Sequence, residues 1–531
     1  MPHTSVALHH VHDLALSSRT GHANPFRVKL HATFAHQGGQ AVRNLPGFYD
    51  GDGTWKIRFS PLRQGRWKGV THSDDPNLDA IELPVITCVP NRNRSIHGLV
   101  GIDPRDRHRF AWSDGTPCVP LGFELDWLAA FHQRLGQPKG RPVNRRLDRF
   151  APAMDLLVRR GFNYLAACVY AHRQFTPPSH PYALTPPDLY CFGGTNEQPD
   201  HSVLNVAFFR DFDQAVAALH RRGIVLNLML QVLNKDANWP APRSAEDDAY
   251  WQYVVARYQA YGNIIWDVAK ESFRYIRDLP DHGKGYIHSR LELIRRTDAY
   301  RHLVTAHDNQ VDSNGCNTDI DGICDFVSDQ VHCWRGRTTD AVDIAWELNR
   351  EAMRRFRGLS KPYVNIEYGY ERGAEPIPTI DMGAGTRSGE DLLIWAYALY
   401  AGGGHANYYY NNTSWNLVKF RPEPPSWRRY GYLRGFLDRM DLRGMAPDND
   451  FSRNGMCLAR CGRRYFVFLP EGGDDVLDLA AVDARPLECR WMDILTGKIV
   501  CARLRGGSFL TPLKNPLPDT TQPCAVYLEA T

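Results

Sequence analysis

Short apolar segments recur through the middle of the chain, from about residue 95 to residue 440, and stretches long enough for helices separate them. The intervening stretches 149–161 and 211–223 have apolar positions at helical spacing. Both end in basic residues followed by glycine, which is typical of a helix end. Strands that alternate with helices over this length predict an α/β fold of the (βα)8 or TIM barrel type. The eight apolar segments are 118–124, 162–170, 223–230, 263–271, 302–307, 325–332, 362–369 and 404–411.

A doubly wound parallel sheet would show the same alternation of strands and helices. That fold carries a glycine-rich phosphate-binding loop after its first strand. The first apolar segment instead continues into GFELDW (122–127), which is no such loop. The barrel is therefore the favoured architecture.

On both sides of this region, apolar and polar residues alternate with the two-residue period of β-strands. At the amino end, GFYDGDGTWKIRFSP (47–61) contains a Gly-Asp-Gly turn and then a strand in which Trp55, Ile57 and Phe59 alternate with polar residues. Turns and apolar strands return after about residue 450. We therefore expect three domains, namely an N-terminal β-sandwich (1–92), the barrel (93–445) and a small C-terminal β-sandwich (446–531).

Composition and charge limit the kinds of partner. Hydrophobic residues make up 43% and charged residues 23% of the chain, which is ordinary for a globular protein. The formal charge is 63 − 59 = +4 and the arginines are dispersed, so we expect no nucleic-acid partner and no membrane partner. No apolar run is long enough for a membrane span. The amino terminus does not read as a secretory signal, so a cytoplasmic location is expected unless a signal has been removed.

The twelve cysteines do not predict a metal site. Cys457 and Cys461 are the closely spaced pair, and no second pair follows at the spacing of zinc ligands. Others, such as Cys118 and Cys168, lie in apolar segments as core residues do. We expect reduced thiols, no metal and no organic cofactor.

Two glutamates stand where barrel enzymes carry their catalytic groups, at the carboxyl ends of strands. The fourth apolar segment, in YGNIIWDVAKES (261–272), ends on Glu271, and the seventh, PYVNIEYG (362–369), carries Glu367. Strands four and seven face each other across a barrel. Two carboxyl groups about 5 Å apart there would suit retaining glycoside hydrolysis. The alternative is that each is an ordinary strand-end residue in a salt bridge.

Several segments also resemble a known family. GFYDGDGTWKIRFSPLRQGRW resembles the N-terminal immunoglobulin-like domain of unknown function that precedes many clan A glycoside hydrolases. RFAWSDGTPCVPLGFELDW resembles the opening of the apiosidase-like barrel family. NIIWDVAKES and KPYVNIEYGYE resemble that clan's acid/base and nucleophile strands, and RWMDILTGK resembles its small C-terminal β-domain. The resemblance extends over nearly the whole chain.

The resemblance implies that Glu271 is the acid/base and Glu367 the nucleophile. One position departs from the clan, because Lys270 stands where an asparagine usually precedes the acid/base and binds the sugar's 2-hydroxyl. An ammonium offers donors but no acceptor. Lys270 could therefore alter hydroxyl recognition, favour an anionic sugar or lower the proton affinity of Glu271. It could equally form a salt bridge directed away from the sugar.

A sugar site also needs aromatic surfaces and several hydrogen-bonding groups. The predicted strand ends supply both kinds of side chain, although a core histidine bonded to backbone would explain His172 as well. The candidate substrate-binding residues are Asp126, Trp127, Tyr170, His172, Gln231, Lys270, His332, Trp334, Tyr368, His405, Asn407 and Tyr409.

The function expected from the sequence is that of a retaining glycoside hydrolase acting on a carbohydrate substrate. A transglycosylase would use the same residues, and a non-catalytic carbohydrate-binding protein could have the same scaffold. The flanking sandwiches could pack on the barrel or contact another subunit, so a homo-oligomer stays open. The sugar, its linkage, and exo or endo action are left open by the sequence.

Overall fold

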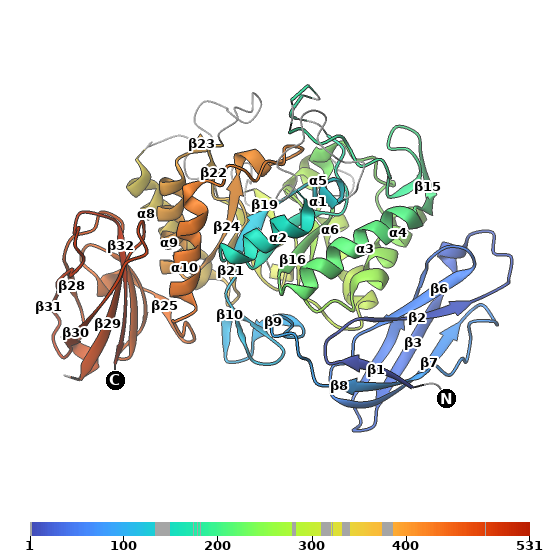
Figure 1. The fold of residues 1–531 in the computed structure, drawn as a ribbon, viewed down its shortest axis with the longest axis horizontal. Helices are drawn as coiled ribbons and strands as arrows, with labels where there is room; N and C mark the ends of the chain where they lie inside the picture. Colours follow the sequence, from blue (N-terminus) through green and yellow to red (C-terminus); the bar gives the residue numbers. More distant parts are fainter. Residues whose placement is uncertain are drawn as a thin grey trace.

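The computed structural model describes most of the chain in full atomic detail. The described residues are 3–132, 149–173, 175–177, 179–180, 182–278, 283–309, 320, 322–331, 340–373, 386–483 and 485–530. A parallel sheet with helices forms the central part, an N-terminal β part lies at one end and a C-terminal β part at the other (Figure 1).

The N-terminal part consists of two sheets that share one core. Trp55, Ile57 and Phe59 of one sheet are buried against Phe34 and Trp67 of the other, so the predicted alternation is confirmed. The larger sheet has the order β1 (His3–Ala7), β8 (Val85–Val89), β7 (Gly65–Ser73), β3 (Leu30–His36) and β4 (Ala41–Pro46). The smaller has the order β2 (His12–Ser17), β6 (Thr54–Phe59) and β5 (Phe48–Tyr49).

The central sheet is parallel throughout, and each of the eight predicted apolar segments contains one of its strands. The strand order is β18 (Val304–Thr305), β17 (Ile264–Ala269), β16 (Val225–Gln231), β13 (Tyr164–Cys168), β12 (Leu121–Glu124), β24 (His405–Tyr410), β21 (Tyr363–Asn365), β20 (Val327–Gln330) and β19 (Asp308–Asn309). The longer strands β13, β16 and β17 are largely apolar because both of their faces are buried.

The sheet is strongly curved, because strands that are distant in its order lie close together. The end strands β18 and β19 are separated in the chain only by Ala306 and His307. In a flat sheet β17 and β21 would lie roughly 24 Å apart, at about 4.8 Å per strand. Yet Lys270, which follows β17, places its Nζ 3.7 Å from Oε2 of Glu367, which follows β21. This strand order is the one that a (βα)8 barrel requires.

Helices occupy the stretches between the parallel strands and surround the sheet (Figure 1). The two predicted helices are confirmed, although the second begins earlier than the pattern indicates, because Asn205 caps it by accepting from the backbone of Ala207 and Phe208. The helices are α1 (Leu128–His132), α2 (Phe150–Arg159), α3 (Val206–Arg221), α4 (Ala245–Tyr258), α5 (Phe273–Asp278), α6 (Gly283–Thr297), α8 (Ala341–Gly358), α9 (Gly389–Ala401) and α10 (Pro425–Leu437).

Short strands supplement this arrangement at both edges of the sheet. At its amino edge, Val100, Phe110 and Trp112 share a core with Tyr164 and Val225, so a small antiparallel sheet closes that end. Sequence analysis did not anticipate this closure. The small sheet contains β9 (Val100–Asp103), β10 (Asp106–Trp112) and β11 (Pro117–Cys118), and the other short strands are β14 (Phe192–Gly194), β15 (Pro199–Leu204), β22 (Tyr370–Glu371) and β23 (Thr386–Arg387).

The C-terminal part is a six-stranded antiparallel sheet whose central strands β27 (Arg464–Leu469) and β32 (Cys524–Ala530) are largely buried. Phe466 and Phe468 pack towards α9 and α10, with the Phe468 ring stacked 5.3 Å from that of Tyr397. Val467 and Trp491 face a two-stranded sheet on the other side. The large sheet has the order β25 (Ala446–Pro447), β26 (Met456–Arg460), β27, β32, β29 (Pro486–Asp493) and β30 (Ile499–Arg505), and the small one pairs β28 (Asp475–Leu477) with β31 (Thr511–Leu513).

A buried network of ion pairs fixes the N-terminal part to the helices of the central part. Arg58 of β6 donates to both carboxylate oxygens of Asp213 on α3, at 3.1 and 3.0 Å, and it also binds Asp13. Arg257 of α4 binds the same Asp213 and lies 2.9 Å from Asp50. Both guanidinium groups are almost fully buried.

No helix among the described residues is long and apolar enough to cross a membrane.

Removal of Arg58 tests this network. We expect Arg58→Met to lower stability by about 3–5 kcal/mol, because Asp213 and Asp13 lose a buried partner. Urea unfolding followed by tryptophan fluorescence measures the change. The control is Arg66→Met, which replaces an exposed arginine of β7 and should cost less than about 0.5 kcal/mol. Equal midpoints for the two variants would show that the network adds nothing to stability.

Candidate active site at the carboxyl edge of the parallel sheet

Six polar side chains converge at the carboxyl edge of the parallel sheet, where strand ends from opposite sides face each other. They all lie in or just after one of four strands, β12, β17, β21 and β24. All six are buried. They are Glu124, Asp126, Lys270, Glu367, Asn407 and Tyr409.

Lys270 is the centre of this cluster. Its ammonium binds a carboxylate oxygen of Glu124, donates to Oδ1 of Asp126 at 3.2 Å and lies 3.7 Å from Oε2 of Glu367. Burial by itself would lower the pKa of Lys270, but Asp126, Glu124 and Glu367 outweigh burial and raise that pKa well above its ordinary value. Lys270 is therefore a permanent cation in a water-poor site.

Asp126 is fixed from two sides. Its Oδ2 accepts from Nζ of Lys235 at 2.6 Å and from the hydroxyl of Tyr409 at 3.0 Å, while its Oδ1 faces Lys270. Burial opposes ionisation, yet the two lysines hold the pKa of Asp126 well below its usual range. The ammonium of Lys235 also lies 4.3 Å from the centroid of the Trp415 ring.

Glu124 is about as deeply buried as Asp126. Lys270 binds its Oε1, and Nδ2 of Asn407 donates to its Oε2 at 3.3 Å. Burial raises the pKa of Glu124 well above its ordinary value, and the nearby charges of Asp126 and Glu367 act in the same direction, against Lys270. The pKa of Glu124 is therefore shifted in the direction opposite to that of Asp126.

Glu367 faces donors on both of its carboxylate oxygens. The hydroxyl of Tyr370 donates to Oε1, and Nε2 of Gln330 donates to Oε2 at 2.9 Å. With Lys270 beside Oε2, these contacts favour the ionised carboxylate. The side chain is 5% exposed, so little water competes with these partners.

A series of buried polar side chains connects Asn227, inside the sheet, to Gln330. Nδ2 of Asn227 donates to Asp267 at 2.7 Å, and Oδ2 of Asp267 lies 2.8 Å from Nδ1 of His307. Nε2 of His307 lies 3.5 Å from Nε2 of Gln330. If Asp267 accepts the Nδ1 proton, the other imidazole nitrogen is an acceptor that orients the amide towards Glu367.

Glu271 adjoins Lys270 but has a different partner. Its carboxylate pairs with Arg274 on the first turn of α5, and its side chain is 11% exposed. Its backbone φ of 53° lies in the left-handed region, which costs energy for a residue with a side chain. The chain turns at this point, so Lys270 and not Glu271 reaches across to Glu367.

The motif KPYVNIEYGYE contains a second glutamate, Glu371, which has a different environment. Its Oε2 accepts from the hydroxyl of Tyr408 at 2.7 Å and from that of Ser426 on α10. Burial raises the pKa of Glu371 to about 7. Glu371 therefore lies on the helix side of the sheet, whereas Glu367 lies in the cluster.

The structure brings together some of the predicted substrate-binding residues and leaves others apart. Asp126, Lys270, Asn407 and Tyr409 belong to the cluster. His332 and Trp334 lie outside the described residues.

Three predicted residues near the carboxyl edge form a separate group or face the core. Tyr170 packs against Tyr190, and its hydroxyl lies 3.1 Å from Nδ1 of His172, which pairs with Glu197. Trp127 is 1% exposed and lies within the core between strands and helices. None of these three contacts Glu367 through a contact that the described part of the chain shows.

Three further predicted residues point away from the cluster. Gln231 donates to Asp247 of α4 at 2.9 Å, and Tyr368 bonds to Tyr430 of α10 at 2.7 Å. His405 is the first residue of β24, so it lies at the amino edge, where its ring is 5.5 Å from that of Phe110. A substrate-binding role for these three residues stays a prediction.

The roles of several residues in and around the cluster were not predicted from the sequence. Glu124 was visible only as a residue after the first strand, and Gln330 only as the end of the sixth. Lys235 follows LNLMLQVLN, and a lysine so close to an apolar strand was a usable signal. Tyr370 gave no such signal, because its contact with Glu367 depends on the turn between them.

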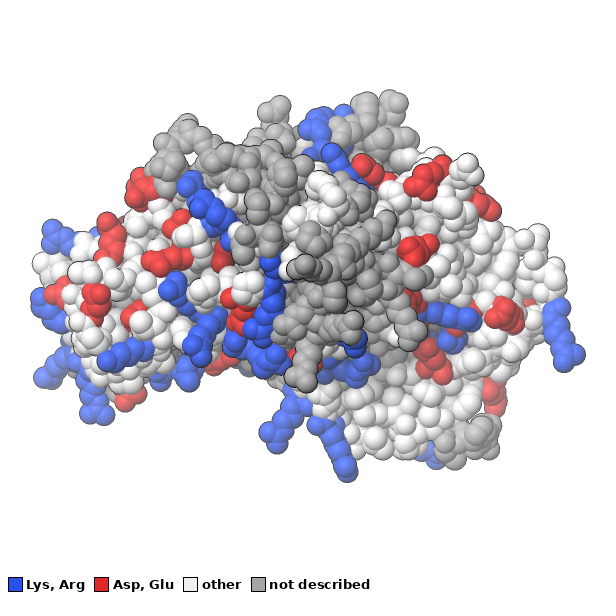
Figure 2. All heavy atoms as spheres, turned by 45° about the horizontal axis from the view of Figure 1, so that its top comes forward, with Lys and Arg blue, Asp and Glu red and all other residues white. Residues whose placement is uncertain are grey.

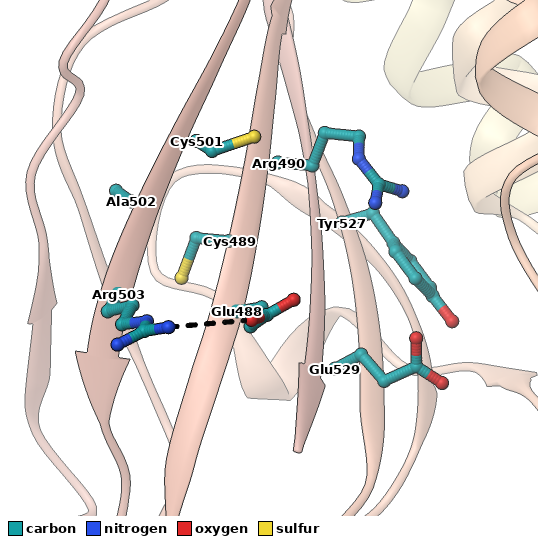
Figure 3. A pocket seen from close by; sticks show the side chains of 8 residues that line it. All are labelled: Glu488, Cys489, Arg490, Cys501, Ala502, Arg503, Tyr527 and Glu529. Carbon is teal, nitrogen blue, oxygen red and sulfur yellow. Dashed lines mark ion pairs between the residues drawn. The ribbon is translucent and has the colours of Figure 1, made fainter. Parts of the chain in front are cut away.

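The described residues on the face shown in Figure 2 form no similar cluster of polar side chains. The described parts of the face in Figure 2 carry acidic and basic side chains interspersed. A hollow of about 470 Å³ lies against the C-terminal sheet, where Glu488 and Arg503 pair at 3.9 Å (Figure 3). Both of these side chains are largely exposed, unlike the buried cluster. Within the described ranges, no group of three or more His, Cys, Asp and Glu side chains could hold a metal ion.

Comparisons with known proteins agree with the sequence resemblance. Residues 149–438, more than half of the chain, match the family described as the apiosidase-like catalytic domain. Residues 5–74 match a domain of unknown function, DUF5060. A search of the curated proteins finds no match.

Solved structures share the fold at low sequence identity. A candidate glycoside hydrolase from Bacteroides vulgatus matches with a TM-score of 0.76 and 19% identity over 99% of this chain and 100% of its own. A family 5 glycoside hydrolase from the same organism gives 0.58 and 16% over 82% and 93%. A third structure, named as a glycoside hydrolase, gives 0.59 and 15% over 82% and 97%. At these identities the likeness shows a shared α/β fold with an N-terminal β part.

The raised pKa of Glu371 predicts a pH dependence of stability. The folded state holds this proton more tightly than the unfolded state, so the stabilisation is present below about pH 4.5 and is lost as pH rises through about 7. Glu371→Gln stays neutral and should match the wild type at pH 5. At pH 8 it should be more stable, by up to about 3 kcal/mol.

Thermal unfolding at the two pH values measures this difference. The control is Glu488→Gln, which removes a 62% exposed carboxylate and should behave alike at both. A Glu371→Gln advantage that is the same at pH 5 and pH 8 would mean that Glu371 does not hold a proton in the folded state.

Proposed function

The chain belongs to the apiosidase-like family and is a glycosidase, and we propose that it hydrolyses its glycoside by a retaining double displacement with Glu367 as the nucleophile and Glu271 as the acid/base. The observation that carries this proposal is the environment of Glu367. A carboxylate that attacks an anomeric carbon must be ionised and held in one orientation. Lys270, Gln330 and Tyr370 supply both conditions.

We also infer that the parallel sheet is a closed (βα)8 barrel in which β18 and β19 are two pieces of the fifth strand. The strand order and the contact between Lys270 and Glu367 support this inference. The carboxyl edge is then the mouth of the barrel, where such enzymes bind their substrates. The N-terminal and C-terminal β parts would flank the barrel away from the reacting bond.

In the first step, a carboxylate oxygen of Glu367 forms a bond to the anomeric carbon as the glycosidic bond breaks. The departing oxygen takes the proton of Glu271, so the leaving group departs as a neutral alcohol. In the second step, Glu271 accepts a proton from water, and the resulting hydroxide oxygen attacks the same carbon. The ester bond breaks, and Glu367 recovers its negative charge.

Glu271 suits the acid/base role through its position. It follows β17 directly, at the same edge of the sheet as Glu367. Its strained backbone also supports a functional assignment, because such strain persists where the surrounding structure imposes it. Transfer of the glycosyl group to another sugar would use the same two steps with a different acceptor.

The buried donors around Glu367 favour an enzyme over a non-catalytic binding protein. A binding protein gains little from three groups that hold one carboxylate ionised in a water-poor site. A nucleophile needs such an arrangement in every turnover.

A panel of activated aryl glycosides tests the proposed reaction. The panel should include α and β anomers and both pyranosides and furanosides, each assayed with the wild type and with Glu367→Gln. We expect the wild type to cleave one class of glycoside. Glu367→Gln should not cleave that class, since the amide cannot form the glycosyl ester. Unchanged turnover in Glu367→Gln would refute the nucleophile assignment.

Glu271→Gln separates the two steps. Aryl glycosides with a good leaving group need no protonation, so the first step should survive and a glycosyl-enzyme should accumulate, visible by intact-protein mass spectrometry. Glycosides with a poor leaving group should react about 10²–10⁴-fold more slowly than with the wild type. Glu371→Gln is the matched control and should leave both classes of substrate unaffected. An equal loss on good and poor leaving groups would remove Glu271 from the acid/base role.

A further inference from the structure

Building on the proposed function, we infer that Lys270 is the fixed counter-ion of Glu367 and binds no part of the substrate, so the glycosyl group held against Glu367 is a neutral sugar and not a uronide. The choice lies between the two roles that a lysine can have beside a nucleophile. One is recognition of an anionic substrate, and the other is control of the nucleophile's charge and position.

Three carboxyl groups surround the ammonium of Lys270, and two of them accept hydrogen bonds from it. An ammonium has three N–H groups. The two acceptors are Glu124 and Asp126, and Glu367 lies 3.7 Å away. The side chain is 3% exposed, so it is enclosed by these partners. A substrate group would have to displace one of them.

A second ion pair prevents such displacement. Asp126 cannot turn away from Lys270 easily, because Lys235 binds its other oxygen at 2.6 Å and Tyr409 donates to that oxygen as well. Lys235 is itself 1% exposed. Asp126, Lys235 and Tyr409 therefore hold Lys270 in place on the side away from a substrate at Glu367.

Charge balance also disfavours an anionic sugar. Two lysines, Lys235 and Lys270, pair with three acidic groups. These groups are Glu124, Asp126 and Glu367. A uronate carboxylate beside Lys270 would add a further negative charge to this set of acidic groups. Displacing Glu124 or Asp126 to make room would leave a buried carboxylate without its partner, which is strongly unfavourable.

A double-mutant cycle tests the counter-ion role without any substrate. Lys270→Met should lower the thermal midpoint, because three buried carboxylates lose a shared cation. Addition of Glu367→Gln should recover part of that loss, since one of the repelling charges is removed. The matched control is Lys235→Met, whose ion-pair partner is Asp126. Glu367→Gln should recover less in that background.

The cycle has a definite contrary outcome. Equal effects of Glu367→Gln in the wild-type and Lys270→Met backgrounds would mean that the two side chains are not coupled, and the counter-ion role would be wrong. If Lys270→Met does not fold, Lys270→Gln, which keeps two N–H donors, replaces it in the same cycle.

A kinetic comparison tests the substrate class. Neutral aryl glycosides and the matching aryl uronides, with one aglycone, are assayed with the wild type and with Lys270→Gln. We expect the wild type to cleave a neutral member and no uronide. In Lys270→Gln, kcat on the neutral member should fall by at least about tenfold, while KM changes by less than about threefold, because the lysine acts on Glu367.

A different pattern would overturn this assignment. Wild-type cleavage of a uronide, with a KM for that uronide that rises in Lys270→Gln, would make Lys270 a substrate ligand. The two proposals can fail separately. Coupling between Lys270 and Glu367 without cleavage of any glycoside would confirm the counter-ion and count against the proposed hydrolysis.

Discussion

The buried ammonium of Lys270 is the constraint on which the rest of the site depends. A cation with so little exposure to water is stable only when anions replace its hydration, and here Glu124, Asp126 and Glu367 do so. These partners come from strands on opposite sides of the sheet. The lysine therefore stabilises the site only if the sheet is curved and its carboxyl edge is correctly assembled.

The remainder of the fold keeps this edge in place. The small sheet around Phe110 and Trp112 fills the amino end of the parallel sheet, so the strands cannot slide inwards. Arg58 and Arg257 fix the N-terminal part to α3 and α4 through Asp213, and the C-terminal sheet packs on α9 and α10. Both β parts thus contact the helix layer, and neither contributes a side chain to the cluster among the described residues.

The sequence was sufficient for the fold and for part of the site. Each of the eight predicted segments contains a strand of the parallel sheet, because strands that are buried on both faces are rich in apolar residues. Glu367 was identified as a candidate from its place at a strand end. The pairing of Lys270 with Glu124, Asp126 and Glu367 was not predictable, because β17 ends at Ala269 and strand alternation stops there, so the pattern cannot show which of Lys270 and Glu271 points inwards. The contacts of Lys235 and Gln330 were not predictable for a related reason, since they arise only between strands that the fold brings together.

The composition of the cluster also fits a nucleophile whose charge changes during the reaction. When Glu367 forms a glycosyl ester it loses its negative charge, and a lysine paired with Glu367 alone would become an unbalanced buried cation. Lys270 keeps Glu124 and Asp126 as partners at that stage, so ester formation does not leave it unpaired. Gln330 adds a neutral donor whose strength does not depend on that charge, and His307 and Asp267 orient it. Under the proposed double displacement, the additional carboxyl groups would therefore remain as partners of Lys270 once Glu367 is esterified.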